Sequence, residues 1–167
     1  KRDTGVLERG LGSVGDTLII VASDHGEEFR EHGQLHHRGG LHQELTRILL
    51  MISGPGIEAR RVSADVSLVD VLPTILELVE IDAVTDRDGR SLAPILRTGG
   101  RDLQQDLSHR TLFAHRLEKA KRFGKETWAA IQGRWKMIDG VKGQQLFDLE
   151  NDFFEQNDRA GDEPEIL

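Results

Sequence analysis

The sequence has 167 residues, enough for one ordinary domain, and 37% of them are hydrophobic, enough for a packed core. Its 22 Lys and Arg against 29 Asp and Glu give a formal charge of -7, which argues against a nucleic-acid partner. No apolar run approaches the roughly 18 residues of a membrane span, and no signal-peptide core follows the first residues, so we expect no membrane partner. Cysteine is absent, so a metal would have to be held by His, Asp, Glu or carbonyl groups.

The sequence opens on Lys1 rather than on Met and enters at once a charged, helix-compatible stretch. We therefore expect a chain cut from something longer.

Two apolar, β-branched runs and one amphipathic segment dominate the first hundred residues. The runs cover residues 17–23 and 47–53, and each is typical of a strand buried on both faces. Residues 67–80 have helical periodicity, with Ser67 as a cap and Pro73 limiting the regularity of the first turns. Buried strands followed by a long helix predict an α/β layered fold with a largely parallel sheet.

The character of the chain changes after a short helical segment at residues 91–96. Residues 99–110 are polar and contain two adjacent glycines, so we place a domain boundary here, between residues 1–100 and 101–167. Four short runs follow, separated by Gly-containing turns: residues 111–114, 127–131, 135–138 and 145–148. They predict a small antiparallel sheet. The acidic residues from Glu150 onward predict a surface segment or a short terminal helix.

The first candidate site is Ser23-Asp24-His25-Gly26, directly after the first predicted strand. Open α/β sheets bind their ligands outside the carboxyl ends of their strands. Carboxylate oxygen and imidazole nitrogen form a common ligand pair for divalent metals, and Gly26 allows the chain to leave strand geometry so that both side chains reach one ion. The alternative is a turn with a surface histidine.

Histidines gather after this element. Five of the seven lie in one Gly-rich stretch, at positions 25, 32, 36, 37 and 42. A long functional loop is a natural host for such a group, although some of the five are expected to be solvated. The spacing is not that of a zinc protease, because His-Glu-x-x-His is absent. Glu27 and Glu28 are interpreted as ordinary surface acids, and His109 and His115 are assigned no chemistry.

A family resemblance rests on several motifs in order. They are Ser23-Asp24-His25-Gly26-Glu27-Glu28-Phe29-Arg30-Glu31-His32-Gly33, then His37, Leu41-His42-Gln43-Glu44-Leu45, Ser53-Gly54-Pro55-Gly56-Ile57, residues 66–76, residues 88–92 and residues 145–150. Together they resemble the second half of the sulfatase family, of the alkaline-phosphatase-like superfamily. The resemblance implies part of a three-layer α/β sheet with a small C-terminal antiparallel β subdomain. It also implies that Asp24 and His25 bind the metal, and that His37 occupies the catalytic position where relatives place Lys or His against the sulfate.

The sequence departs from the family pattern in three places. Residues 47–49 replace the usual Arg-Val-Pro, and residues 151–155 replace a common Asp-Pro before Glu155, a change that we interpret as bearing on the tail and not on the site. None of the serines begins the Cys/Ser-x-Pro/Ala-x-Arg motif from which the family makes its formylglycine nucleophile. We therefore expect the C-terminal part of a sulfatase, inactive alone, with formylglycine and a further carboxylate pair supplied upstream.

The resemblance further implies a divalent metal, with calcium favoured and manganese or zinc as alternatives, and a small-molecule or carbohydrate sulfate ester as substrate. It leans toward a periplasmic or secreted location. Two other functions stay open at this point: a phosphate or phosphonate ester hydrolase of the same superfamily, and a non-catalytic domain that retains the fold.

Overall fold

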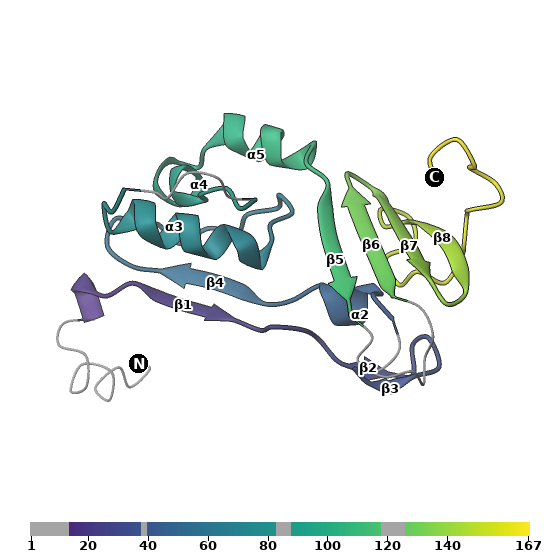
Figure 1. Ribbon diagram of the computed structural model, residues 1–167. Helices are drawn as coiled ribbons and strands as arrows, with labels where there is room; N and C mark the ends of the chain where they lie inside the picture. Colours follow the sequence, from purple (N-terminus) through teal and green to yellow (C-terminus); the bar gives the residue numbers. More distant parts are fainter. Residues whose placement is uncertain (1–13, 38–39, 83–87, 118–125) are drawn as a thin grey trace. The chain divides into compact units, whose positions relative to one another are not determined.

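The computed structural model describes residues 14–37, 40–82, 88–117 and 126–167 (Figure 1). The chain forms two compact units, one of residues 1–23 and 49–105 and one of residues 24–48 and 106–167. This division differs from the expected domains, because residues 24–48 group with the C-terminal sheet rather than with the flanking strands. No helix within the described ranges has the length and apolar character needed to cross a membrane.

The first unit contains one strand pair. Strands β1 (Ile19–Ala22) and β4 (Leu50–Ser53) run antiparallel, with Ile19 opposite Ser53. The prediction of a largely parallel sheet is wrong for these two strands. An apolar run reports burial but not direction, and the chain between them turns back so that the Ser23 N–H donates to the Leu49 carbonyl at 3.1 Å. Both strands are also partly exposed, Met51 by 56%, which contradicts burial on both faces.

The predicted helix over residues 67–80 forms in two pieces. A 3₁₀ turn η2 (Leu68–Asp70) leads into α3 (Val71–Leu78), and the Asp70 carboxylate accepts the Ser67 N–H at 2.8 Å. Pro73 lies in the first turn of α3, where its missing N–H leaves no helical hydrogen bond unmade. The expected cap and the expected irregular start are therefore confirmed.

Asp70 also orders the segment that follows α3. Its side chain is fully buried, and its Oδ1 accepts the Arg90 N–H at 2.8 Å. Beside this bond, a Cβ at Gly89 would lie 1.9 Å from the Val69 carbonyl oxygen, so only glycine fits. Two helices follow, α4 (Ala93–Thr98), as predicted, and α5 (Arg101–Ser108), which the polar composition did not predict.

The second unit is built on a four-stranded antiparallel sheet. Its strands, in the order β5-β6-β7-β8, are β5 (Leu112–Arg116), β6 (Thr127–Gln132), β7 (Trp135–Gly140) and β8 (Gly143–Asp148), which confirms the predicted sheet. A short helix α2 (Gln43–Thr46) and a hairpin of β2 (Glu28–Phe29) and β3 (Leu35–His36) belong to the same unit. Leu41, from the segment before α2, packs with Ala129, Ile138 and Phe147 in the core of this unit.

Candidate functional site

Asp24 and His25 follow β1 in a turn that rests on helix α2. The Gly26 N–H donates to the Leu45 carbonyl at 2.9 Å, and a Cβ at Gly26 would lie 1.9 Å from the Glu44 carbonyl oxygen. Glycine is therefore required for close approach to the α2 backbone. This contact fixes the chain directly after His25, and the side chains of Asp24 and His25 remain 88% and 45% exposed.

The hydrogen bonds of His25 decide which nitrogen is available for a metal. Its Nδ1 lies 2.7 Å from the Gly26 carbonyl oxygen, an acceptor that requires a proton on Nδ1, so the lone pair of neutral His25 lies on Nε2. The Gly26 carbonyl, opposed by partial desolvation and assisted by Asp24 and Glu27, raises the pKa of His25. Nε2 lies 3.8 Å from Asp24 Oδ2. At this separation one ion can lie about 2.1–2.5 Å from both atoms, so the pair fits one divalent metal.

His37 lies beside His25. Their ring centroids are 4.7 Å apart with the planes inclined by 36°. Glu27 lies between two histidines of the hairpin end, with its carboxylate oxygens 3.7 Å from His36 Nδ1 and 3.7 Å from His37 Nδ1. His36 has φ +70, a conformation that a non-glycine residue rarely adopts and that often marks functional sites. The structure thus brings together the three residues that the sequence singled out and adds Glu27, which we had interpreted as a surface acid.

A second group with metal-ligand chemistry lies in the same unit. His32, His42 and Glu44 each offer a ligand atom within 4.8 Å of the others. The two imidazole rings are stacked, with centroids 3.7 Å apart and planes inclined by only 9°. Imidazole lone pairs lie in the ring plane, so parallel stacked rings direct them side by side rather than toward one ion. This arrangement does not fit a metal centre.

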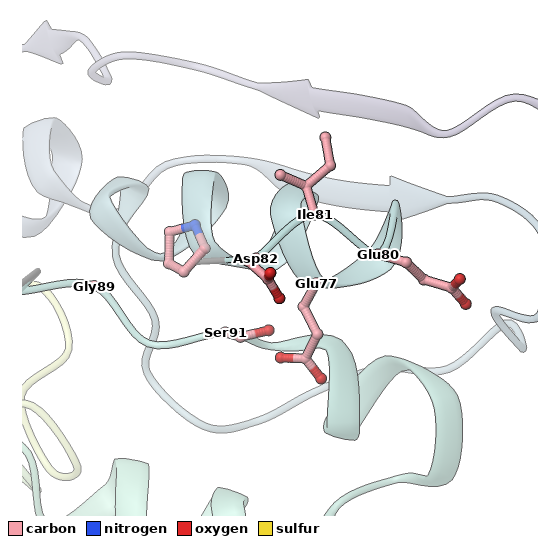
Figure 2. A pocket seen from close by; sticks show the side chains of 7 residues that line it. Glu77, Glu80, Ile81, Asp82, Gly89 and Ser91 are labelled. Atoms are coloured by element: carbon pink, nitrogen blue, oxygen red, sulfur yellow. The ribbon is translucent and has the colours of Figure 1, made fainter. Parts of the chain in front are cut away.

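Two surface hollows are lined by residues other than the candidates. One, in the first unit, is lined by Pro73, Glu77, Glu80, Ile81, Asp82, Gly89 and Ser91 (Figure 2). The other is formed by residues 148–162 of the second unit. None of Asp24, His25 and His37 lines either hollow, and acidic surface groups of this kind are common without a ligand.

Comparison with known proteins decides the family. The sulfatase family model matches residues 9–81, a stretch that includes Asp24, His25 and His37. The chain is similar to the sulfatase family. Arylsulfatase K of Mus musculus is 34% identical over 155 residues, which cover 90% of this chain and 28% of the mouse protein. The chain thus spans less than a third of the length of this relative.

Solved structures agree with the sulfatase assignment. A 2-O GAG sulfatase is 25% identical with a TM-score of 0.78, covering 90% of this chain and 34% of that protein. A protein solved in complex with its substrate D-glucosamine-2-N,6-O-disulfate is 25% identical with a TM-score of 0.73, covering 94% of this chain and 33% of that protein. The expected α/β sulfatase fold with a small C-terminal antiparallel sheet is confirmed.

The segment with the departure at residues 151–155 ends in a buried residue, which we did not expect. Glu155 is not part of a surface tail: only 2% of it is exposed, and its Oε2 accepts the Gln43 N–H at the start of α2 at 2.5 Å. Glu28 is likewise 1% exposed rather than a surface acid. An isolated glutamate in a polar stretch gives no periodic signal, so local sequence could not predict these buried positions.

Proposed function

We propose that the full-length gene product is a metal-dependent sulfatase, and that this chain supplies Asp24 and His25 as metal ligands and His37 as a substrate-binding catalytic residue. The observation that carries the proposal is the convergence of these three side chains within the stretch matched by the sulfatase family. A bound divalent ion would polarise the sulfuryl oxygens and offset the negative charge of the ester. We propose calcium as this ion, because the carboxylate at Asp24 suits an oxygen-rich site.

Three further residues of the chain orient the metal ligand and bind the substrate. Gly26 holds the proton of His25 on Nδ1 and so presents Nε2 outward. His37 lies close enough to His25 to donate a hydrogen bond to an anion held beside the metal pair. Glu27 lies against His37 Nδ1, which restricts the orientation of the His37 ring. The formylglycine implied by the family has no motif among these residues, so the proposal assigns the chain metal and substrate binding rather than nucleophilic attack.

The substrate class proposed first is a sulfated sugar. One similar structure is a 2-O GAG sulfatase, and another was solved with a disulfated glucosamine as its substrate. The exposed positions of Asp24, His25 and His37 suit a polar, hydrated ester. The compared proteins give no support to the phosphate and phosphonate ester hydrolases that we considered as alternatives.

The test uses the purified full-length gene product with an activated aryl sulfate, sulfated disaccharides, and matched phosphate and phosphonate esters. Asp24→Asn should weaken calcium binding and lower kcat/KM by about 100-fold or more, because it removes a charged ligand. His37→Ala should lower kcat by about 100-fold to 1,000-fold and leave calcium affinity nearly unchanged.

Two exposed residues provide matched controls. Asp82→Asn and His109→Ala make the same chemical changes at exposed residues that are not part of the candidate site and should retain wild-type activity. Preferred turnover of a phosphate or phosphonate ester would refute the sulfatase proposal. Full activity of Asp24→Asn would refute the site.

A further inference from the structure

Four charged side chains cluster at helix α2. Two of them are fully buried, and the other two, His32 and Glu44, have 13% and 12% of their side chains exposed. Lys136, on β7, and Glu155, in the segment after β8, are both fully buried at their side chains, with Nζ and Oε1 2.8 Å apart. The ammonium of Lys136 also donates to Thr46 Oγ1 at 3.1 Å. Glu155 Oε2 accepts the Gln43 N–H. The ion pair therefore forms hydrogen bonds with the first and the last residue of α2.

His32 joins this pair to Glu44. Its Nδ1 lies 2.6 Å from Glu44 Oε1, and its Nε2 lies 3.0 Å from the Glu155 carbonyl oxygen. Neither a carboxylate nor a carbonyl donates a hydrogen bond, so both contacts are made only when both ring nitrogens carry protons. These two acceptors, the closest polar contacts of the ring, favour an imidazolium, and with His32 protonated the cluster contains two cations and two anions.

Two segments carry the candidate residues, the turn at His25 and the β2–β3 hairpin before His37. We call them the two arms of the site, and both contact this cluster. The turn that carries His25 lies on the α2 backbone through Gly26. The β2–β3 hairpin, which leads into His37, has His32 in its connecting turn. Helix α2 is thus held by Lys136 and Glu155 from one direction, and it supports one arm directly and the other through His32.

We propose that the largely buried cluster of His32, Glu44, Lys136 and Glu155 is a positioning device that holds His25 and His37 against each other. Its use in catalysis rests on the sulfatase function proposed above, whereas its control of the His25–His37 geometry does not. A change in any one charge leaves an opposite charge buried without its partner, so the two arms loosen together.

The electrostatic surroundings of His32 support a proton held at neutral pH. Burial lowers the pKa of His32, but the hydrogen bonds that it donates to Glu44 and to the Glu155 carbonyl, together with the negative charges of both glutamates, outweigh it, so the net pKa is raised. The stacked His42 ring stays neutral beside it, because burial and the charges of His32, Lys136 and Lys142 lower the pKa of His42 to about 3. A raised pKa means that the contribution of His32 is complete below its unfolded pKa and is lost as pH rises through its folded value.

The first test needs no variant. The full-length gene product is labelled with ¹³C-histidine, and the ring signals of His25, His32 and His37 are followed from pH 5 to pH 9. The His25 and His37 signals should show a further inflection at the pH where His32 loses its proton. Independent titration of His32, without a response at His25 and His37, would overturn the proposal.

Substitutions then test the cluster itself. Glu155→Gln keeps the shape of the side chain, and it should shift the His25 and His37 signals and weaken calcium binding about tenfold. Adding Lys136→Met should recover part of this loss, because the uncompensated cation is also removed. Asp162→Asn, which removes an exposed partner of Arg159 in the same unit, serves as the control and should change neither quantity.

The outcomes separate the two proposals. Unchanged histidine signals and calcium affinity in a folded Glu155→Gln protein would refute the positioning role, and His32→Gln answers the same question if Glu155→Gln does not fold. Coupled histidine signals in a protein without sulfatase activity would refute the proposed function and leave the positioning role standing. A zinc-dependent rise in Tm that His32→Gln abolishes and Asp24→Asn does not would identify the cluster as a metal site and overturn the proposal.

Discussion

Replacing Lys136 by methionine should destabilise the protein in a strongly pH-dependent way. Methionine keeps most of the apolar stem but removes the ammonium that lies 2.8 Å from Glu155 Oε1, with both side chains fully buried. Glu155 is then left in a site where burial already raises its pKa from the ordinary value of 4.5. Removing one partner of a buried ion pair costs about 3–5 kcal/mol in the free energy of unfolding.

Protonation of Glu155 sets an upper limit on this loss. A carboxyl with a raised folded pKa binds a proton in the folded state while the unfolded state remains ionised, so stability falls as pH rises above the unfolded pKa. At about 1.36 kcal/mol per pH unit, the loss is limited to about 3.4 kcal/mol at pH 7 and about 1.4 kcal/mol at pH 5.5. The lost hydrogen bond to Thr46 adds about 1 kcal/mol at both pH values.

Urea unfolding of the full-length gene product, followed by tryptophan fluorescence at pH 5.5, 7 and 8, measures this dependence. Trp128 and Trp135 lie on β6 and β7 of the same sheet and report on it. The Lys136→Met and Glu155→Gln double variant should lose less stability than Lys136→Met alone, and its loss should be nearly constant with pH. A loss for Lys136→Met that is equal at pH 5.5 and pH 8 would refute the reasoning.

Two further substitutions test one structural contact in each unit. Gly26→Ala should abolish calcium binding and cost about 1–3 kcal/mol in calorimetry, because its Cβ would meet the Glu44 carbonyl oxygen at 1.9 Å. Gly161→Ala, where a Cβ meets nothing within 4 Å, should be neutral, and equal effects of the two would contradict the contact. Asp70→Asn should cost about 2–3 kcal/mol, because it weakens two hydrogen bonds that backbone N–H groups donate to a fully buried carboxylate. A Tm equal to that of Asp82→Asn, an exposed control, would show that the Asp70 charge is dispensable.

The residues of the candidate site could be chosen from the sequence because their signals are local. Asp24 and His25 follow an apolar run directly, and the motif that contains them has enough members in order to resemble one family. The four strands of the C-terminal sheet were also predicted, since short apolar runs and glycine turns depend on near neighbours. The family resemblance and the sheet were therefore determined by patterns that span only a few residues each.

Strand direction and the grouping of residues 24–48 could not be predicted in this way. Apolar periodicity is the same for parallel and antiparallel partners, so the pairing of β1 with β4 depends on the path of the chain between them. The membership of residues 24–48 in the second unit depends on contacts of α2 with β7 and with the segment after β8.

The charged cluster at α2 shows most clearly what tertiary structure alone decided. His32, Glu44, Lys136 and Glu155 are polar residues, and by residue type each is expected at the surface. A charge can be buried only where an opposite charge and hydrogen-bonding groups are already in place, and here those partners lie as far apart in the sequence as His32 and Glu155. No local pattern records such a pairing, because the energy that favours burial arises only once the distant partners meet.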